Sequence, residues 1–173
     1  MSDSTFTPQD EHFMRRAIEL AHKAEQEGEV PVGALLVKDG EIIAEGWNRS
    51  ISTHDATAHA EIEVLRKAGK ILENYRLNDT TLYVTLEPCP MCAGALLHSR
   101  VKRIVFGAFD KKTGAAGSIL NMFEHQAAYH YADLEKGVLE QQCRTQLQSF
   151  FKRRREEQRE KKSQSKNKAR CIS

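Results

Sequence analysis

A histidine and a glutamate, His59 and Glu61, stand two positions apart in the sequence, and two cysteines, Cys89 and Cys92, follow later in a P-C-x-x-C segment. Two thiolates and one neutral imidazole are ligands that zinc prefers, in a tetrahedral arrangement. Three protein ligands leave the fourth position open. In catalytic zinc sites that position holds a water, whose pKa the ion lowers to roughly 7. The sequence therefore predicts a catalytic zinc site bound by His59, Cys89 and Cys92, in which Glu61 transfers the proton of this water.

The spacing of these residues also predicts how the chain must hold them. Neighbours on one face of a helix are three or four residues apart, so residues two positions apart diverge along a regular helix. His59 and Glu61 can therefore approach one ion only where a loop enters the first turn of a helix. Cys89 and Cys92 are expected at the start of a second helix, whose positive end favours thiolates. We expect the zinc site where two helix N-termini meet.

Two other uses of the same residues remain open from the sequence. His54 and His59 have an H-x4-H spacing, so His54 could complete a closed structural zinc site with the two cysteines. That arrangement would leave Glu61 without a role. The second alternative is a disulfide between Cys89 and Cys92, which is less common in a chain without export signals. The closed zinc site would have no open coordination position, and the disulfide would leave neither cysteine as a thiolate ligand.

The elements that must position these residues alternate between helices and strands. Asp39-Gly40 lies between two apolar runs, which is a strong signal for a β-hairpin. A helix between two later strands indicates a parallel crossover, so the sheet should contain both parallel and antiparallel strands. We expect an α/β fold, a three-layer α/β/α sandwich with a mixed five-stranded sheet. The expected helices cover residues 8–26, 59–69, 93–97 and 138–151, and the expected strands cover residues 32–37, 41–45, 81–85, 103–107 and 131–134.

A loop rich in glycine and alanine, residues 108–118, follows the fourth expected strand. Such residues permit the backbone to approach other groups closely. The loop is expected either to pack against a neighbouring group or to be an ordinary flexible connection.

The length and charge of the chain indicate one domain with a basic C-terminal end. With 173 residues the chain is long enough for one core and too short for two. The net charge is +2, but residues 152–170 contain ten Lys or Arg against three Asp or Glu. We expect a folded domain over residues 1–158. The basic tail over residues 159–173 is expected to be disordered, because its apolar content is too low for folding.

The sequence begins without the basic and apolar regions of a secretory signal, and no stretch approaches the roughly eighteen apolar residues of a membrane span. We therefore expect a cytoplasmic location and no membrane partner. Of the remaining cysteines, Cys143 falls on an apolar helix face and Cys171 lies in the tail, so the sequence indicates no disulfide framework.

H-x-E followed by P-C-x-x-C is the signature of zinc-dependent nucleobase deaminases. Beyond this signature, the sequence from about Phe13 to Phe151 closely resembles the bacterial tRNA-specific adenosine deaminases of the cytidine and deoxycytidylate deaminase superfamily. The segments that carry the resemblance are residues 29–34, 46–49, 57–61, 81–89, 106–108 and 112–118. The resemblance implies a cytidine deaminase-like fold and a homodimer with one zinc ion per subunit.

The resemblance also implies a reaction, the hydrolytic deamination of the wobble adenosine to inosine in the anticodon loop of an arginine tRNA. Glu61 would take a proton from the zinc-bound water and deliver protons to N1 of adenine and to the departing amine. Asn48 would form a hydrogen bond with the purine, although the sequence also allows it to cap a loop. Asp110 would lie beside the nucleotides that flank the target.

Three consecutive arginines, Arg153, Arg154 and Arg155, follow Phe150 and Phe151. Basic residues with aromatic neighbours are typical of surfaces that contact phosphates and stacked bases. Arg153 is therefore a candidate contact to the tRNA anticodon stem-loop, whereas the charges from residue 159 onward could equally be a solvated run.

Two rival functions remain open from the sequence. A deaminase of free bases or nucleosides would share every metal ligand, but residues 46–48, residues 114–118 and the basic C-terminal end favour RNA. The other rival is a zinc-stabilised RNA-binding module without activity, in which Glu61 would have no chemical role.

Overall fold

The predicted hairpin is present at the edge of the sheet. The protein is described by a computed structural model, which covers residues 6–126, 128 and 130–170. Strand β1 (Gly33–Lys38) pairs antiparallel with β2 (Glu41–Trp47), and the turn between them contains Asp39 and Gly40, both with positive φ. An aspartate tolerates this conformation and glycine adopts it freely, which explains the hairpin signal in the sequence.

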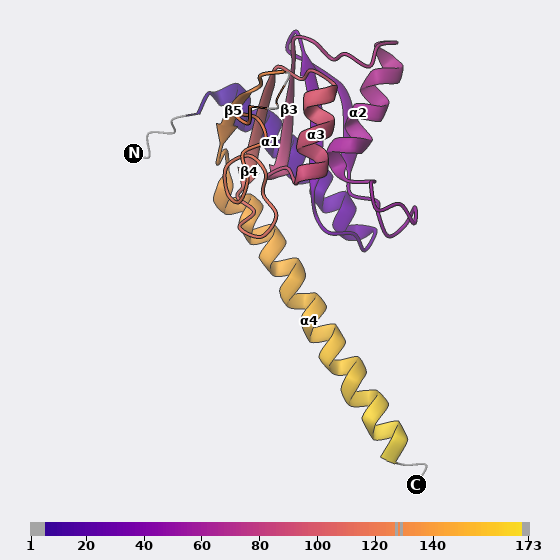
Figure 1. The fold of residues 1–173 in the computed structure, drawn as a ribbon. Coiled ribbons are helices and arrows are strands. Elements are labelled where there is room, and N and C mark those ends of the chain that lie inside the picture. Colours follow the sequence, from indigo (N-terminus) through magenta and orange to yellow (C-terminus); the bar gives the residue numbers. More distant parts are fainter. Residues whose placement is uncertain (1–5, 127, 129, 171–173) are drawn as a thin grey trace.

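Three further strands complete a mixed sheet in the order β2-β1-β3-β4-β5 (Figure 1). Strand β3 (Thr80–Leu86) is antiparallel to β1, and it is followed in the sheet by β4 (Arg103–Ala108) and β5 (Asp133–Lys136), both parallel to it. The crossover between β3 and β4 is a helix, as predicted. The structure thus confirms the mixed five-stranded sheet.

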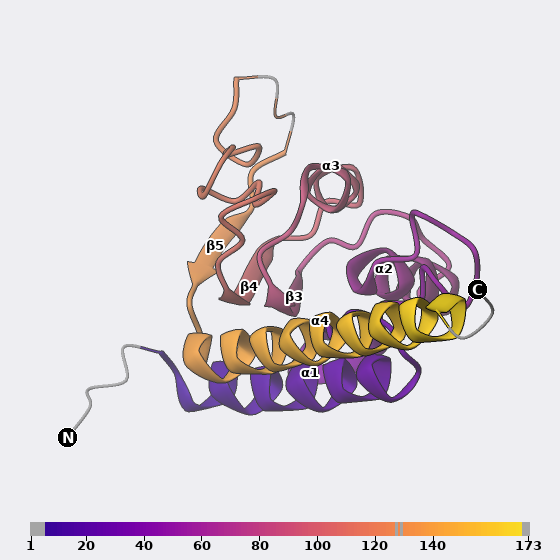
Figure 2. The same cartoon turned by 90° about the horizontal axis from the view of Figure 1, so that it is seen from below.

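Helices cover both faces of this sheet (Figure 2). Helices α1 (Pro8–Gln26) and α4 (Glu140–Arg170) lie on one face, and α2 (Ala60–Ile71) and α3 (Pro90–His98) lie on the other. Because side chains alternate along a strand, each strand contributes to two cores. Leu35, Tyr83 and Val105 pack with α1, whereas Leu36, Leu82 and Ile104 pack with α2 and α3. The expected three-layer α/β/α sandwich is confirmed.

Four strands end at the same edge of the sheet. Strands β2 and β3 are antiparallel to β1, and β4 and β5 are parallel to β3. All four strands therefore run in the same direction, and their carboxyl ends lie together. Asn48 follows β2 at this edge, Cys89 follows β3, and Asp110 follows β4. Functional groups gather at such edges in α/β folds because loops leave the rigid strands there.

A buried ion pair joins α1 to the middle of the sheet. Arg103 donates hydrogen bonds of 2.7 and 2.9 Å to the two carboxylate oxygens of Asp10, and the Tyr83 hydroxyl donates another of 2.8 Å. The Arg103 guanidinium is the main reason that the pKa of Asp10 is lowered to about 2. This network fixes the position of α1 against β3 and β4.

The sequence predicts disorder from residue 159, but helix α4 continues to Arg170. This correction has a local cause: the segment is rich in Lys, Arg, Glu and Gln, which are strong helix formers even without apolar contacts. Low apolar content therefore prevents this segment from packing against a core, but it does not prevent the segment from forming a helix. Residues 171–173, including Cys171, lie outside the described residues, and a domain boundary at residue 158 remains a prediction.

Helix α4 is also too polar to enter a bilayer. Within the part of the chain that the structure describes, no helix combines the length and apolar character needed to cross a membrane.

Candidate active site

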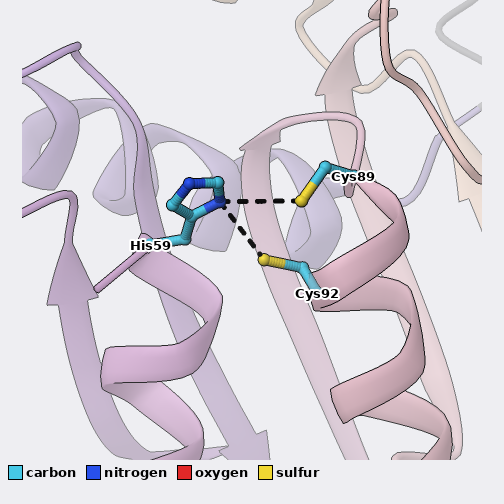
Figure 3. A group of neighbouring side chains, drawn as sticks. All are labelled: His59, Cys89 and Cys92. Carbon is cyan, nitrogen blue, oxygen red and sulfur yellow. Dashed lines mark hydrogen bonds between the residues drawn. The ribbon is translucent and has the colours of Figure 1, made fainter. Parts of the chain in front are cut away.

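The three predicted metal ligands lie at the N-termini of two neighbouring helices (Figure 3). His59 is the residue immediately before α2, Cys89 is the residue immediately before α3, and Cys92 lies in the first turn of α3. His59 and Cys89 both have extended backbone conformations, so their side chains leave the loop before the helical spacing begins. This confirms the prediction that two helix N-termini meet at the site.

The donor atoms have the separations that a tetrahedral zinc ion requires. His59 Nδ1 lies 3.6 Å from Cys89 Sγ and 3.5 Å from Cys92 Sγ. Bonds of about 2.0–2.1 Å to nitrogen and about 2.3 Å to sulfur at a tetrahedral angle place such atoms roughly 3.6 Å apart. The three residues therefore fit zinc in both ligand chemistry and geometry, with one coordination position left for a water or substrate.

The electrostatics of the two cysteines also suit a cation. A hydrogen bond from Cys92, followed by one from His59, lowers the pKa of the Cys89 thiol to about 4. The same interaction with Cys89, together with burial, raises the pKa of Cys92. The pair thus shares one proton at neutral pH, and a divalent cation that displaces this proton would meet two thiolates.

Glu61 lies in the first turn of α2 and is buried, with 4% of its surface exposed. Burial raises the pKa of its carboxyl group to about 7. A group that exchanges protons near neutral pH is the most effective general acid and base there. The sequence identified this residue, and the structure supplies the physical reason for its suitability.

Asn48 is oriented by the start of α2. Its Oδ1 accepts a hydrogen bond of 2.9 Å from the backbone N–H of Ala60. Because the oxygen must face this donor, the amide nitrogen, which is a donor only, occupies the other side of the group. Asn48 therefore has the capping role that the sequence left open, because its side chain binds a backbone N–H at the start of α2. It also fixes the orientation in which Asn48 could donate to an acceptor on a base.

The sequence did not reveal the role of Glu87, which organises the glycine- and alanine-rich loop. This carboxylate is 2% exposed and accepts hydrogen bonds from the backbone N–H groups of Asp110, Ala116 and Ser118 at 2.9–3.0 Å, and from the Ser118 hydroxyl. Gly114 is required because a Cβ there would lie 2.4 Å from the Glu87 carboxyl carbon. The close backbone approach that the loop composition allows is thus an approach to Glu87.

Glu29 has the same function for the loop that precedes His59. It is 1% exposed and accepts hydrogen bonds from the backbone N–H groups of Ile51 at 3.2 Å and Ser52 at 2.7 Å. In the sequence, each of the two carboxylates lies directly beside an apolar residue and a nearby proline, Glu29 before Val30-Pro31 and Glu87 between Leu86 and Pro88. Each one holds a loop on one side of the metal ligands.

The structure places the two remaining candidates, Asp110 and Arg153, in different surroundings. Asp110 accepts hydrogen bonds from the backbone of Lys112 and Thr113 and from the Thr113 hydroxyl, so it shapes its own loop at the sheet edge. Arg153 lies on α4, where it donates a 2.8 Å hydrogen bond to Glu25 of α1. Asp110 therefore lies at the edge that carries the metal ligands, whereas Arg153 belongs to the α1–α4 contact.

The alternative uses of the metal ligands find no support. Among the described residues, the group of side chains that could bind a metal consists of His59, Cys89 and Cys92. His54 is exposed in the preceding loop and is not part of it. Cys89 and Cys92 are free thiols, as is Cys143, which is buried as expected.

Comparison with known proteins agrees with this geometry. Residues 7–108 match the family model described as the cytidine and deoxycytidylate deaminase zinc-binding region. A tRNA-specific adenosine deaminase of Haemophilus influenzae is 56% identical over 155 residues, which cover 89% of this chain and 90% of the relative. The Bacillus subtilis tRNA-specific adenosine deaminase is 49% identical over 159 residues, covering 92% and 97%.

A solved structure supports the same relationship. It comes from biochemical and structural studies of A-to-I editing by tRNA:A34 deaminases at the wobble position of transfer RNA. It matches with a TM-score of 0.77 and 43% sequence identity, covering 79% of this chain and 99% of that chain.

The sandwich fold, the three zinc ligands and the adjacent buried carboxylate define a zinc-dependent deaminase of the cytidine deaminase-like class. Within this class, the chain belongs to the family of the tRNA-specific adenosine deaminases.

Proposed function

We propose that this enzyme hydrolytically deaminates adenosine to inosine at the wobble position of a tRNA anticodon. The observation that carries the proposal is the buried Glu61 beside a zinc site with an open position, in a chain 56% identical to a tRNA-specific adenosine deaminase. The reaction replaces the amino group on C6 of adenine by the oxygen of water and releases ammonia.

Zinc held by His59, Cys89 and Cys92 would supply an activated water as the nucleophile. Glu61 accepts a proton from the attacking water and donates one to N1 of the ring, which makes C6 more electrophilic. It then accepts the second proton of the former water, from the hydroxyl group formed on C6, and donates it to the departing amine, which leaves as ammonia while the C6–N bond breaks. One carboxylate can serve both steps because its pKa lies near neutrality, so neither protonation state is costly. Asn48 positions the base through the amide nitrogen that faces away from α2.

We further propose an arginine tRNA as the substrate, as the family resemblance implies. Asp110, at the same sheet edge as the metal ligands, would contact nucleotides beside the target, and Arg153 would contact phosphate in competition with its protein partner Glu25. The wobble base lies in a single-stranded loop and can enter a pocket without the cost of opening a duplex. Because its substrate is a tRNA, a cytoplasmic location is part of this proposal.

A homodimer is also part of the proposal. The surface groove between α2 and α3 is lined by residues of both helices and by Tyr75, which is 68% exposed. Helix α3 presents the small residues Gly94 and Ala95, both partly exposed. A second copy could pack closely against such a face.

The decisive experiment uses zinc-loaded protein and a tRNA transcript with adenosine at the wobble position, with inosine detected by sequencing. We expect inosine at that position alone, and a loss of roughly 10³-fold or more in Glu61→Gln, because general acid and base catalysis contributes up to about 10⁴-fold. Zinc content and the thermal unfolding temperature of Glu61→Gln should remain normal, which separates chemistry from folding.

Free adenosine, cytidine and guanine are the controls for the rival deaminases. Efficient turnover of a free compound, without inosine in the tRNA, would replace the RNA reaction by one on small molecules. Full activity of Glu61→Gln would instead support a module in which this carboxylate has no chemical role.

A further inference from the structure

The end of helix α4 carries its basic residues in a stripe. Lys152, Arg155, Arg159 and Lys162 are separated by three, four and three positions, and the same spacing continues in the sequence at residues 166 and 170. Positions three and four apart lie on one face of a helix. The stripe thus follows one side of α4 over eighteen residue steps, or about 27 Å at 1.5 Å per residue.

The opposite side of this segment faces the body of the protein. Arg153 donates to Glu25 of α1 at 2.8 Å, and Arg154 donates to the backbone carbonyl of Gly28 at 2.7 Å. Glu157 lies close to both arginines, 3.9 Å from Arg153 and 3.6 Å from Arg154. Two of the three consecutive arginines are therefore engaged by protein groups, and the stripe is turned away from them.

Two of the three acidic residues of this segment lie away from the stripe. Glu157 and Glu160 occupy positions on the side of Arg153 and Arg154, whereas Glu156 borders the stripe, four residues after Lys152 and three before Arg159. In the part of the chain that the structure describes, Arg155, Arg159 and Lys162 form no ion pair, and all three are exposed. Like charges at this spacing destabilise a helix by a few tenths of a kcal/mol per pair.

The position of the stripe relates it to the active site. Helix α3 begins at the carboxyl end of β3 and α4 begins at the carboxyl end of β5, and these parallel strands end at one edge of the sheet. Instead of returning along the sheet, the second half of α4 extends beyond the body (Figure 1). A nucleic acid bound over the metal ligands would approach this edge, from which α4 projects.

We propose that the stripe is an RNA-binding surface, which contacts the phosphate backbone of the tRNA outside the base that reacts. The proposal rests on the proposed function for the identity of the RNA. The chemistry of the surface supports it, because a row of exposed cations that outnumbers its one acidic neighbour, Glu156, is complementary to a row of phosphates. An anionic membrane is a poorer match, since a helix that binds a bilayer surface needs an apolar face opposite its charges. Here the opposite side is acidic and ion-paired.

The test compares two variants of equal charge. Lys162→Gln with Lys166→Gln removes two cations from the stripe, whereas Lys161→Gln with Lys168→Gln removes two from other positions of the same helix. Both changes replace lysine by glutamine, which has a similar helix propensity. Affinity for a full-length tRNA transcript is measured over a series of KCl concentrations, with helix content checked by circular dichroism.

We expect the stripe variant to bind tRNA roughly three- to tenfold more weakly, as for two exposed charge contacts. The slope of log affinity against log salt should become shallower by about 1.4–1.8, at about 0.7–0.9 per phosphate contact. The control variant should behave as wild type. In deamination assays the stripe variant should raise KM and leave kcat unchanged, because it loses binding that does not depend on the transition state.

Equal slopes for the two variants would overturn the stripe as an RNA surface while leaving the deaminase intact. Binding of the wild type to anionic vesicles, lost only in the stripe variant and accompanied by equal tRNA slopes, would overturn it in favour of a membrane. Stripe-dependent tRNA binding without any inosine would support the surface and reject the proposed reaction.

Discussion

The metal centre and the projecting half of α4 are held by the protein in opposite ways. At the metal centre, three ligands from two helix starts lie within 4.8 Å of one another, and buried carboxylates fix the loops on both sides. The end of α4 is exposed and follows only its own helical spacing. Bond making requires atoms placed within a fraction of an ångström, whereas charges attract over a Debye length of about 8–10 Å. Changes at the centre should therefore have large effects, and changes on α4 should have small effects that depend on salt.

Removal of zinc is the strongest test of this contrast. Treatment with a chelator should lower deamination by at least about 10³-fold, since no other group can activate the water. The fold should survive, because the two apolar cores lie along the sheet and not at the metal ligands. Activity, bound zinc and far-ultraviolet circular dichroism would be measured together, and added zinc should restore activity. Loss of the fold on chelation would show that the metal is structural.

The next largest effect is expected for Glu87, which contacts no substrate in the proposed mechanism. Glu87→Gln replaces a charged acceptor of four hydrogen bonds by an amide that presents two donors to the same N–H groups. Hydrogen bonds to charged groups contribute about 1.5–3 kcal/mol each, and we expect a loss of roughly 2–4 kcal/mol in stability, with kcat/KM lowered about 10- to 100-fold.

Hydrogen exchange provides the readout that is specific to this role. The amides of Asp110, Ala116 and Ser118 should exchange faster in Glu87→Gln, with zinc retained. Glu29→Gln is the matched control and should instead expose the amides of Ile51 and Ser52. Unchanged protection of the 110–118 loop would show that Glu87 does not hold it.

The sequence predicted what depends on local spacing. Asp39-Gly40 specifies the hairpin by its own backbone preference, and the two-residue separation of His59 and Glu61 requires a helix start. These features involve neighbours along the chain, so periodicity and turn chemistry are sufficient to find them.

The sequence could not predict contacts between distant segments. Glu87 binds loop groups 23 to 31 residues away, and Arg153 meets Glu25 across 128 residues. Only the packed fold shows which of the three consecutive arginines are already occupied. The disorder expected from residue 159 was inferred from low apolar content. Apolar content determines whether a segment packs against a core, whereas helix formation depends on the helix propensity of its residues.

A smaller effect is expected for the ion pair between Asp10 of α1 and Arg103 of β4. The pKa of Asp10 is lowered to about 2 in the folded protein, so the unfolded chain binds the proton more readily. Its contribution, roughly 2 kcal/mol, is fully present above about pH 4 and is lost as the pH falls toward 2.

Asp10→Asn isolates this contribution. Because zinc dissociates when its ligands are protonated, both proteins would be studied without metal. The free energy of unfolding of the wild type should fall more steeply between pH 4 and pH 2 than that of Asp10→Asn. Parallel curves would mean that the Arg103 contact does not stabilise the charged form.

The smallest effect is expected for Arg153, although it heads the basic segment. Its guanidinium is bound to Glu25 at 2.8 Å and lies 5.8 Å from the Phe150 ring, so an RNA phosphate would have to compete with a protein carboxylate. Exchange of one ion pair for another gains little, and exposed pairs contribute about 0.2–1 kcal/mol. Arg153→Ala should therefore weaken tRNA binding by less than about threefold, whereas Arg155→Ala, on the free side of α4, should weaken it more and flatten the salt dependence. If Arg153→Ala had the larger effect, the Glu25 contact would have to open when RNA binds, and α4 would then be coupled to the body more closely than its exposed surface indicates.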